Sequence, residues 1–436
     1  MKEGKKRSPR RPRSPGPLVA PPGFEIVEGV YRRRELLSYR ELPRVARFLT
    51  PGSTVSTPRR LAPPTATALS RLATASDLDG GRPEAGRPAE GRPAEGRPAE
   101  GRPAEGRPAE GRPAEGRPAA GHLFFDLEAT GLSTGAGSVA FLLGLARLLP
   151  EGVELTQWLL PDYPYEPELL LSFAHALEPR GIAPQELTLV SYNGRAFDTP
   201  LLRSRMLINA IPFEPPPQLD LLPFARRLWR RFLDDCSLST VEASILGVTR
   251  EEDVPGALVP QRYFDYLATG ESEPLREVVA HHRQDILTLV DLLARVEALL
   301  RGEEESGRVD RFELGRLLLE NPGVPEGPRR GEAILAELTA DESEEREAIY
   351  YGWLLRRQGR LREAVAVWRS AFERHGTLAP GILLAKALEH DLSRFDEALE
   401  VVEAMLAGEE SRGASQGILD ALGHRQARLR RRIASS

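Results

Sequence analysis

The stretch FFDLEATG, Phe124 to Gly131, places two carboxylates one residue apart at the end of an apolar run. Such a run predicts a buried strand, and side chains at i and i+2 of a strand project from the same face. Asp126 and Glu128 would therefore lie side by side and repel each other. A hard divalent cation would relieve that repulsion, whereas the alternative is a solvated strand end without a ligand.

The composition limits the class of protein. A chain of 436 residues with 41% hydrophobic content is long enough for two or three domains. Its single cysteine, Cys236, excludes an intrachain disulfide and a thiolate metal site, which fits a reducing compartment. No apolar run approaches the roughly 18 to 20 residues of a membrane span, and the N-terminus lacks the apolar core of a signal peptide. We expect a cytoplasmic protein with no membrane association.

The charge is unevenly distributed along the chain. The formal net charge is −5, yet residues 1–16 carry seven Lys or Arg against one Glu, and RQARLRRRI near the C-terminus carries five Arg and no acid. Basic ends of this kind either contact nucleic-acid phosphates or are solvated tails without a partner. Both interpretations stay open.

A five-residue repeat fills residues 81–120: GRPEA, six copies of GRPAE, then GRPAA. Each unit holds one Gly and one Pro, so neither helix nor sheet can propagate, and alternating Arg and Glu keep the segment near neutral. We interpret it as a linker. Residues 1–80 would be a basic, mostly disordered, low-complexity arm, in which residues 23–50 have enough apolar content to pack on a later domain.

Alternating strand and helix patterns follow the repeat. Strands are expected at His122–Leu127, Val139–Leu149, Val153–Leu160 and Leu187–Tyr192. Helices are expected at Glu166–Glu178, Asp198–Asn209, Ser237–Leu246 and Pro274–Leu300. Three consecutive strands should form a meander, with the first helix after them. Residues 121–302 therefore predict an α/β domain with a mixed sheet flanked by helices.

The stretch SYNGRAFDTPLL carries the next carboxylate, Asp198. A buried strand runs into a turn at Asn193 and Gly194, and Asp198 then begins a helix that has Pro200 in its first turn. The Asp198 side chain could cap this helix and do nothing more. That alternative stays open, because a capping residue can also bind a metal.

The stretch AHHRQDILTLVDLL carries the last acid, Asp285, on a helix with an apolar face. His281, four residues earlier, shares one side of the helix with Asp285, whereas His282 is rotated by about 100° from His281. Lone His and Asp residues on a helix are usually surface or capping residues. The set of four acids favours a metal site instead.

These motifs together resemble a known family. The segments are Asp126-Leu-Glu128, Tyr192-Asn193-Gly194 with Phe197-Asp198, and His281-x-x-x-Asp285. They are similar to the three exonuclease motifs of the DEDD nucleases, and most of all to the YprB-type ribonuclease-H-like domain. That domain has Tyr where this chain has His281. The His-type DEDD enzymes place their His five residues before the last Asp, where this chain has Ala280.

The resemblance implies a ribonuclease-H-like fold and hydrolysis of phosphodiester bonds with two Mg²⁺ or Mn²⁺ ions. By analogy, Asp126 would bridge both ions, and Glu128 and Asp285 would complete the first site. Asp198 would support the second ion, and His281 would orient or deprotonate the attacking water.

Two classes of function follow. The first is a 3′–5′ exonuclease acting on single-stranded DNA or RNA. The second is a catalytically silent nucleic-acid-binding or scaffold protein that kept the fold. The presence of all four acids favours the enzyme. No GxxxxGK[ST] loop occurs, which argues against an ATPase or helicase.

Residues for gripping the substrate are less clearly marked. Residues 121–302 hold 15 Arg and no Lys against 25 acids, which is not the basic surface of a tight nucleic-acid binder. The segment PFARRLWRRF offers Arg226, Arg227 and Arg230 on a short helix that could follow a phosphate backbone, although a solvated helix face is the alternative. Asn193, in the second motif, is a further candidate for substrate binding.

The C-terminal part is helical in pattern. Two segments align at an offset of 34 residues, which superposes Ala364 on Ala398 and Arg360 on Arg394. This is the tetratricopeptide period, so residues 346–408 predict tetratricopeptide-like repeats after connecting helices in residues 303–345. The repeats would bind a protein partner or only complete the fold. Residues 409–436 would form a basic C-terminal tail.

Overall fold

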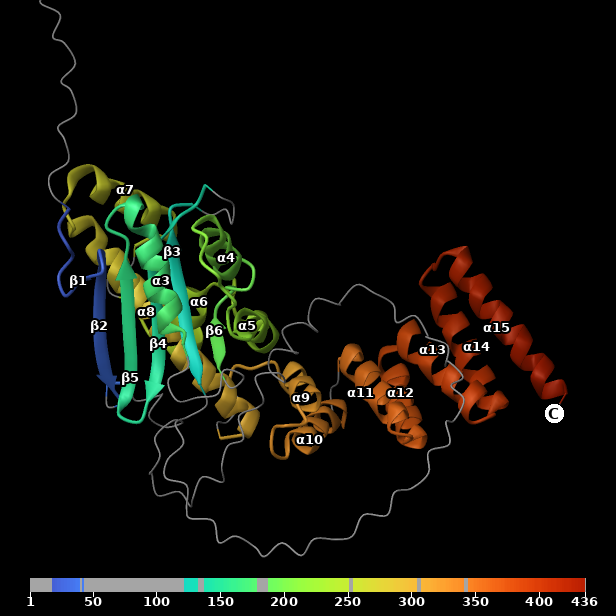
Figure 1. Ribbon diagram of the computed structural model, residues 1–436. Coiled ribbons are helices and arrows are strands. Elements are labelled where there is room, and N and C mark those ends of the chain that lie inside the picture. Colours follow the sequence, from blue (N-terminus) through green and yellow to red (C-terminus); the bar gives the residue numbers. More distant parts are fainter. Residues whose placement is uncertain are drawn as a thin grey trace, which may run out of the picture. The chain divides into compact units, whose positions relative to one another are not determined.

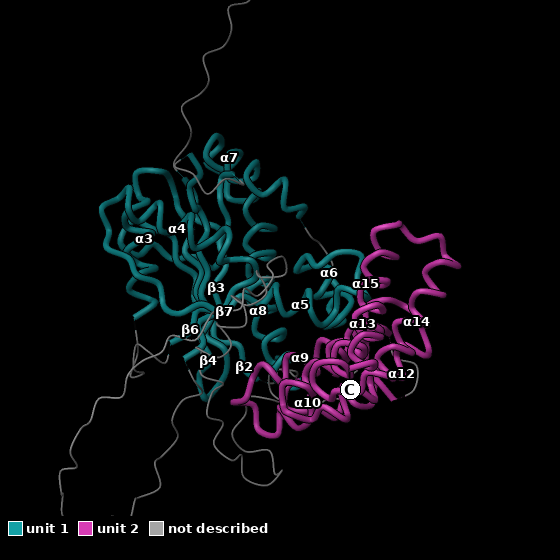
Figure 2. Tube along the Cα trace, turned by 90° about the vertical axis from the view of Figure 1, so that its right-hand side faces the viewer, with its two compact units in different colours: residues 1–299 teal, residues 300–436 magenta. Residues whose placement is uncertain are grey.

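The computed structural model describes residues 18–39, 41–42, 121–131, 137–178, 187–250, 254–303, 307–340 and 344–435. Most of the predicted N-terminal arm and the whole GRPAE repeat lie outside these residues. The chain divides into two compact units, residues 1–299 and 300–436 (Figure 2). Each unit is described by itself below.

The first unit is built on a seven-stranded sheet with the order β1-β2-β5-β4-β3-β6-β7 (Figure 1). The strands are β1 (Glu25–Val27), β2 (Val30–Ser38), β3 (His122–Ala129), β4 (Ala140–Leu149), β5 (Gly152–Leu159), β6 (Thr188–Ser191) and β7 (Gln218–Asp220). Strands β3, β4 and β5 form the expected antiparallel meander, and β6 and β7 run parallel to β3. The predicted mixed sheet is confirmed.

Two strands of this sheet come from the segment before the repeat. The sequence left open whether residues 23–50 pack on a later domain. In the structure β2 pairs antiparallel with β5 from Tyr31 opposite Leu159 to Ser38 opposite Gly152. The hydroxyl of Tyr39 also donates to the carbonyl of Leu149 at 2.6 Å. The N-terminal segment is therefore part of the α/β unit.

Helices cover both faces of the sheet (Figure 1). They are α3 (Glu166–Ala176), α4 (Asp198–Ile208), α5 (Leu222–Trp229), α6 (Leu238–Val241), α7 (Val259–Thr269) and α8 (Glu273–Arg301). Helix α3 packs Phe173 against Phe125 and Trp158, with ring centroids 5.2 and 5.8 Å apart. Helix α8 covers the opposite face. Gln157, the neighbour of Trp158 on β5, donates to the carbonyl of Val279 on α8, and neighbouring side chains of a strand project from opposite faces.

Gly144, on β4, lets α8 approach the sheet closely. A Cβ atom at this position would lie 2.1 Å from Cδ1 of Ile286 and 2.4 Å from Cε1 of His282. Gly144 is also the register partner of Asp126 on β3. The missing side chain therefore brings α8 down onto the sheet directly beside Asp126, and this contact positions the candidate site.

The second unit is all-helical, as predicted. Its helices are α9 (Arg311–Glu320), α10 (Gly327–Ala340), α11 (Glu345–Arg357), α12 (Leu361–His375), α13 (Leu378–Lys386), α14 (Phe395–Ser411) and α15 (Gln416–Ala434). Trp368, Ala364 and Ala398 lie in its core. The predicted basic tail falls on α15, which buries Leu422 and Leu429 in the same core and is therefore a packed helix.

Within the residues that the structure describes, no helix combines the length and apolar character that crossing a bilayer requires.

Candidate active site

Three elements bring the four predicted acids together. Asp126 and Glu128 project from the face of β3 that α8 covers, since Asp126 pairs with Gly144. Asp198 is the first residue of α4, which follows the turn after β6. Asp285 lies on α8. The negative charges of Glu128, Asp198 and Asp285 each act on Asp126, so the four carboxylates form one electrostatic cluster, called the acid cluster below.

Burial and mutual repulsion make ionisation of this cluster costly. Burial, followed by the charges of Asp285, Asp198 and Glu128, raises the pKa of Asp126 well above its ordinary value. Burial raises the pKa of Glu128 to about 8, with Asp285 and Asp198 adding to the effect against a lowering by His281. Burial and the charge of Asp220 raise the pKa of Asp198 to about 7. Cations are the partners that would stabilise the ionised forms.

Asp285 differs from the other three because it already has positive partners. Burial alone would raise its pKa, but hydrogen bonds and charges from His281 and Arg250 outweigh burial and hold the pKa below its ordinary value. The Arg250 guanidinium forms a short ion pair with Asp285. It also donates to Glu242 from Nε at 2.7 Å. Glu242 is buried and accepts a further hydrogen bond from Gln284 at 2.7 Å.

His281 lies between Arg250 and the acid cluster. One ligand atom from each of Glu128, His281 and Asp285 lies within 4.8 Å of the other two, and this group does not include Asp126 or Asp198. Nδ1 of His281 lies 2.9 Å from the Arg250 guanidinium, and Nε2 lies 3.2 Å from Asp285. Because a guanidinium can only donate, Nδ1 must accept, and a neutral ring carries its proton on Nε2.

His282 has different surroundings from His281. Its side chain is fully buried, and burial lowers its pKa to about 4, so the ring is neutral. The Gln157 amide donates to Nδ1 at 2.9 Å, which leaves Nε2 to donate to the backbone carbonyl of Asp126 at 3.1 Å. Gln157 also donates to the carbonyl of Val279 on α8. His282 thus joins α8 to the strand that carries Asp126.

The turn before Asp198 is fixed by Asp220, at the end of β7. Asn193 has the left-handed φ of 62°, and its backbone N–H donates to Asp220 at 2.7 Å. Gly194 follows, where a Cβ would lie 2.5 Å from the hydroxyl of Ser191 and 2.9 Å from a carboxylate oxygen of Asp198. Phe197, and not Asp198, is the N-cap of α4. Asp198 is therefore not at the N-cap position, and its carboxylate accepts a hydrogen bond from its own backbone N–H in the first turn of α4.

The arginines predicted to contact substrate lie on α5 and the turn after it. Arg226 and Arg227 are in α5, which buries Leu228 and Trp229, and Arg230 begins the turn Arg230–Phe232. Arg226 is near enough to Tyr192 to act on its pKa, although burial is the larger effect and raises that pKa. Arg226 and Arg230 are exposed. Their contribution to substrate binding stays a prediction.

The sequence analysis missed Arg250, Glu242 and Asp220. Arg250 is separated from Asp285 by 35 residues and reaches it only because α6 and the π-helical turn Glu242–Leu246 fold back, ending at Gly247 in the left-handed conformation. No local pattern marks such a contact. Asp220 could have been noticed from the sequence. It is an acid at the end of a short strand, and the neighbouring strand ends in the Asn193 turn.

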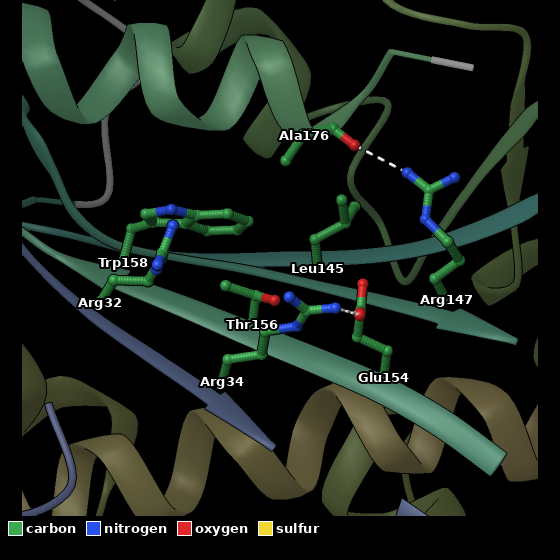
Figure 3. Close-up of a pocket in the computed structure, with 8 residues that line it drawn as sticks. All are labelled: Arg32, Arg34, Leu145, Arg147, Glu154, Thr156, Trp158 and Ala176. Carbon is green, nitrogen blue, oxygen red and sulfur yellow. Dashed lines mark hydrogen bonds and ion pairs between the residues drawn. The ribbon is translucent and has the colours of Figure 1, made fainter. Parts of the chain in front are cut away.

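A cavity of about 60 Å³ lies on the opposite face of the sheet, beside the end of α3 (Figure 3). Three arginines line it. Arg147 donates to the carbonyl of Ala176 at 2.8 Å, and Arg34 pairs with Glu154. Arg32 pairs with Glu25 at 2.8 Å. Since these arginines have protein partners and project away from α8, the cavity is separate from the acid cluster.

The residues present fit divalent metal ions. Carboxylate oxygens are the ligands that Mg²⁺ and Mn²⁺ prefer. The raised pKa values of Asp126, Glu128 and Asp198 show a cluster that lacks compensating positive charge. A cation among these groups would lower their pKa values and stabilise the folded chain.

The comparisons with known proteins agree with this site. A model of the RNase_H superfamily matches residues 123–297, which contain the four acids and His281. RNase H-like domains act on nucleic acid and generally bind divalent metals, which indicates nuclease activity. Over 320 residues the chain is 32% identical to YprB of Bacillus subtilis (strain 168), a protein whose function is uncharacterized; the match covers 72% of this chain and 75% of YprB. The chain belongs to the YprB family within the RNase_H superfamily.

Proposed function

We propose that the chain is a metal-dependent nuclease of the DEDD type, a 3′–5′ exonuclease that hydrolyses single-stranded DNA or RNA. The observation that carries the proposal is the acid cluster. Three of its four carboxylates have raised pKa values, and the fourth lies within 4.8 Å of both Glu128 and His281. A purely structural cluster would gain stability from neutral residues at these positions, so a cation-binding function explains it better.

Asp126, Glu128, Asp198 and Asp285 would hold two Mg²⁺ or Mn²⁺ ions, with Asp126 shared between them. Bound ions would supply an activated water and stabilise the leaving oxygen of an in-line displacement. His281 faces the cluster through Nε2, which carries the proton of the neutral ring, so this N–H would orient the attacking water by donating to it in place of Asp285. With Nδ1 accepting from Arg250, no ring nitrogen is left to take a proton from that water. Arg250 holds the other ring nitrogen and thereby fixes the orientation of the imidazole.

Other parts of the proposal concern the surroundings of the site. Asn193, Arg226, Arg227 and Arg230 are proposed to contact the substrate, the arginines through its phosphates. Residues 346–408 are proposed to be tetratricopeptide-like repeats that complete the fold or bind a protein partner. We also propose that the GRPAE repeat is a linker and that the protein acts in the cytoplasm.

One observation favours the alternative, a catalytically silent nucleic-acid-binding or scaffold protein. Arg250 already pairs with Asp285 and contacts His281, so one side of the acid cluster is neutralised by the protein itself. In a silent homologue, such an arginine would replace the metal's structural contribution. The three remaining acids with raised pKa values favour the nuclease.

The deciding experiment incubates purified full-length chain with Mg²⁺ or Mn²⁺ and end-labelled oligonucleotides, single- and double-stranded, DNA and RNA. A 3′–5′ exonuclease shortens 5′-labelled single strands stepwise and needs the metal. Asp126→Asn is the control for a contaminating nuclease. Failure to cleave any of these substrates with either metal would leave the silent binding protein as the better explanation.

A further inference from the structure

The second unit carries a stripe of arginine and aromatic side chains that the proposed activity does not use. Arg346, Tyr350, Trp353 and Arg357 are spaced by four, three and four residues on α11, so they lie along one face of the helix. We call these four residues the α11 stripe. Trp353 is 43% exposed, and both arginines are exposed. Part of the Trp353 ring therefore faces solvent between two guanidinium groups.

Ring and guanidinium groups alternate along and beside this stripe. The Arg357 guanidinium lies 4.7 Å from the centroid of the Trp353 ring, and Trp353 lies 6.4 Å from Tyr350. On the neighbouring helix α9, Arg316 lies 5.0 Å from the Tyr350 ring. Arg346 lies over the ring of Phe312, at 4.7 Å. These contacts hold the guanidinium groups flat and in fixed positions before any ligand arrives.

We infer that the α11 stripe binds single-stranded nucleic acid, with a base stacked on Trp353, which Tyr350 supports, and with phosphates held by Arg346 and Arg357. Unpaired bases stack on aromatic rings and on guanidinium planes, and arginine pairs with phosphate through two parallel hydrogen bonds. The two arginines are separated by 11 residues, or roughly 16 Å along the helix. Phosphates on both sides of the stacked base could therefore reach separate arginines.

Three acids beside the stripe pair with Arg346 or Arg316. Arg346 pairs with Asp310 at 3.2 Å and with Glu344 at 3.3 Å. Arg316 pairs with Glu313 at 2.8 Å. These pairs hold the arginines beside the rings, and a phosphate would compete for Arg346 at its exposed side. The exposed ring of Trp353 favours a base as the ligand over an acidic peptide, which would need only the charges.

The four tryptophans of the chain allow a direct test, because only Trp353 is exposed among them. Trp158 is 5% exposed, and Trp229 and Trp368 are fully buried. Full-length chain in excess chelator is titrated with single-stranded oligonucleotides of DNA and of RNA, while tryptophan fluorescence and the anisotropy of a labelled strand are recorded. Stacking on Trp353 should quench the fluorescence, and Trp353→Phe should abolish the quenching while binding persists.

Matched variants separate stacking from charge. Trp353→Ala should weaken binding by about 5- to 100-fold, the range for loss of one base stack. Arg357→Ala should reduce the slope of log K against log salt by about 0.7. Phe264→Ala, an exposed aromatic of the first unit, and Arg329→Ala, an exposed arginine on α10, should leave affinity unchanged.

An abasic strand of equal length should bind through its phosphates without quenching. The inference is overturned if the abasic strand, a duplex or a GRPAE peptide quenches Trp353 as strongly as the single strand, or if Trp353→Ala binds like the parent. Because no metal is present and no cleavage is measured, a negative result here leaves the nuclease proposal untouched, and loss of cleavage leaves this inference untouched.

Discussion

Buried carboxylates have opposite surroundings in the two units. In the helical unit, Glu389 is 5% exposed and receives two parallel hydrogen bonds from Arg428, both at 2.8 Å, with Arg425 at 3.4 Å. Burial would raise the pKa of Glu389, but these arginines hold it below its ordinary value. In the α/β unit, burial and neighbouring acids raise the pKa values of Asp126, Glu128 and Asp198.

The difference separates a carboxylate that the chain neutralises from carboxylates whose charge it leaves uncompensated. A buried acid with an arginine partner stabilises the fold only if it is ionised, and its partner is part of the chain. Buried acids that raise one another's pKa values destabilise the ionised fold and need a positive charge from outside the chain. Burial alone does not distinguish the two kinds. The sign of the pKa shift separates Glu389 from Asp126, Glu128 and Asp198, whereas Asp285 has an arginine partner and a lowered pKa within the acid cluster.

Asp126→Asn should have the largest effect. If the acid cluster holds the metals, this change should lower the cleavage rate by at least about 10³-fold, equivalent to several kcal/mol of transition-state stabilisation. Without metal, the melting temperature should hold or rise, by about 2–4 °C for each kcal/mol of relieved repulsion. Cleavage assays and thermal melts of the metal-free chain measure the two effects. Activity within threefold of the parent would remove Asp126 from the site.

His281 and His282 allow a similar comparison between a histidine beside the acid cluster and a buried histidine with partners inside the chain. His281→Ala should reduce the rate by about 10²- to 10⁴-fold with little change in substrate affinity. His281→Tyr should keep substantial activity, since related domains carry Tyr at this spacing. His282→Ala should cost far less activity, but it should lower the melting temperature because it leaves buried Gln157 without its ring partner. A silent His281→Ala beside a damaging His282→Ala in rate assays would reverse the two roles.

Arg250→Met breaks the ion pair between Arg250 and buried Glu242, which is the counterpart in the α/β unit of the Arg428–Glu389 pair in the helical unit. It leaves Glu242 buried without its cation, a loss of about 3–5 kcal/mol of stability. The double variant Arg250→Met/Glu242→Leu should recover the part of that loss that comes from Glu242, whereas Asp285 still lacks Arg250 and keeps His281 as its remaining partner. Thermal melts of the parent, both single variants and the double variant form a complete cycle. If the double variant were as unstable as the sum of the singles, the Arg250–Glu242 pair would not be the source.

The pH dependence of stability should follow the acid cluster when metal is removed. The folded pKa values of Glu128, about 8, and Asp198, about 7, exceed unfolded values near 4. The folded state therefore binds more protons, and stability should fall as pH rises from about 4 to 8. Glu389 acts in the opposite direction, losing its contribution only as pH falls through its lowered pKa. Saturating Mn²⁺ should flatten the decline; an unchanged decline would place the metal elsewhere.

Removing Gly81–Ala120 should have the smallest effect and gives the baseline for the others. The connection from Ser38, which ends β2, to His122, which begins β3, would be about halved in length. Loop-closure entropy then changes by only about 0.6 kcal/mol, in favour of folding. Cleavage of short oligonucleotides should be unchanged. A large drop in melting temperature would show that the repeat has a structural role.

The sequence predicted the parts of the fold that depend on local periodicity. Period-two alternation located Asp126 and Glu128, and the apolar face of α8 located Asp285 and His281 on one side of a helix. The contacts of Arg250 and the pairing of β2 with β5 were not predictable, because they join segments 35 and more than 100 residues apart. The helical pattern favours His281 over His282 as the site histidine. It does not indicate the role of His282, because the burial of this ring against Asp126 depends on the glycine at position 144.

The pairing of β2 with β5 also decides how the sheet ends. The outermost strands, β1 and β7, are only three residues each, and β1 covers only Val30 to Arg32 of β2. Among the described strands, the rest of β2 forms the edge on that side, where the charged residues Arg33, Arg34 and Glu35 discourage strand addition. A chain starting at Gly121 would lose β1 and β2 and leave β5 as the edge, an eight-residue strand whose residues are all buried in the intact protein. Such an edge is a template for intermolecular strand addition, so this truncation would promote self-association and aggregation.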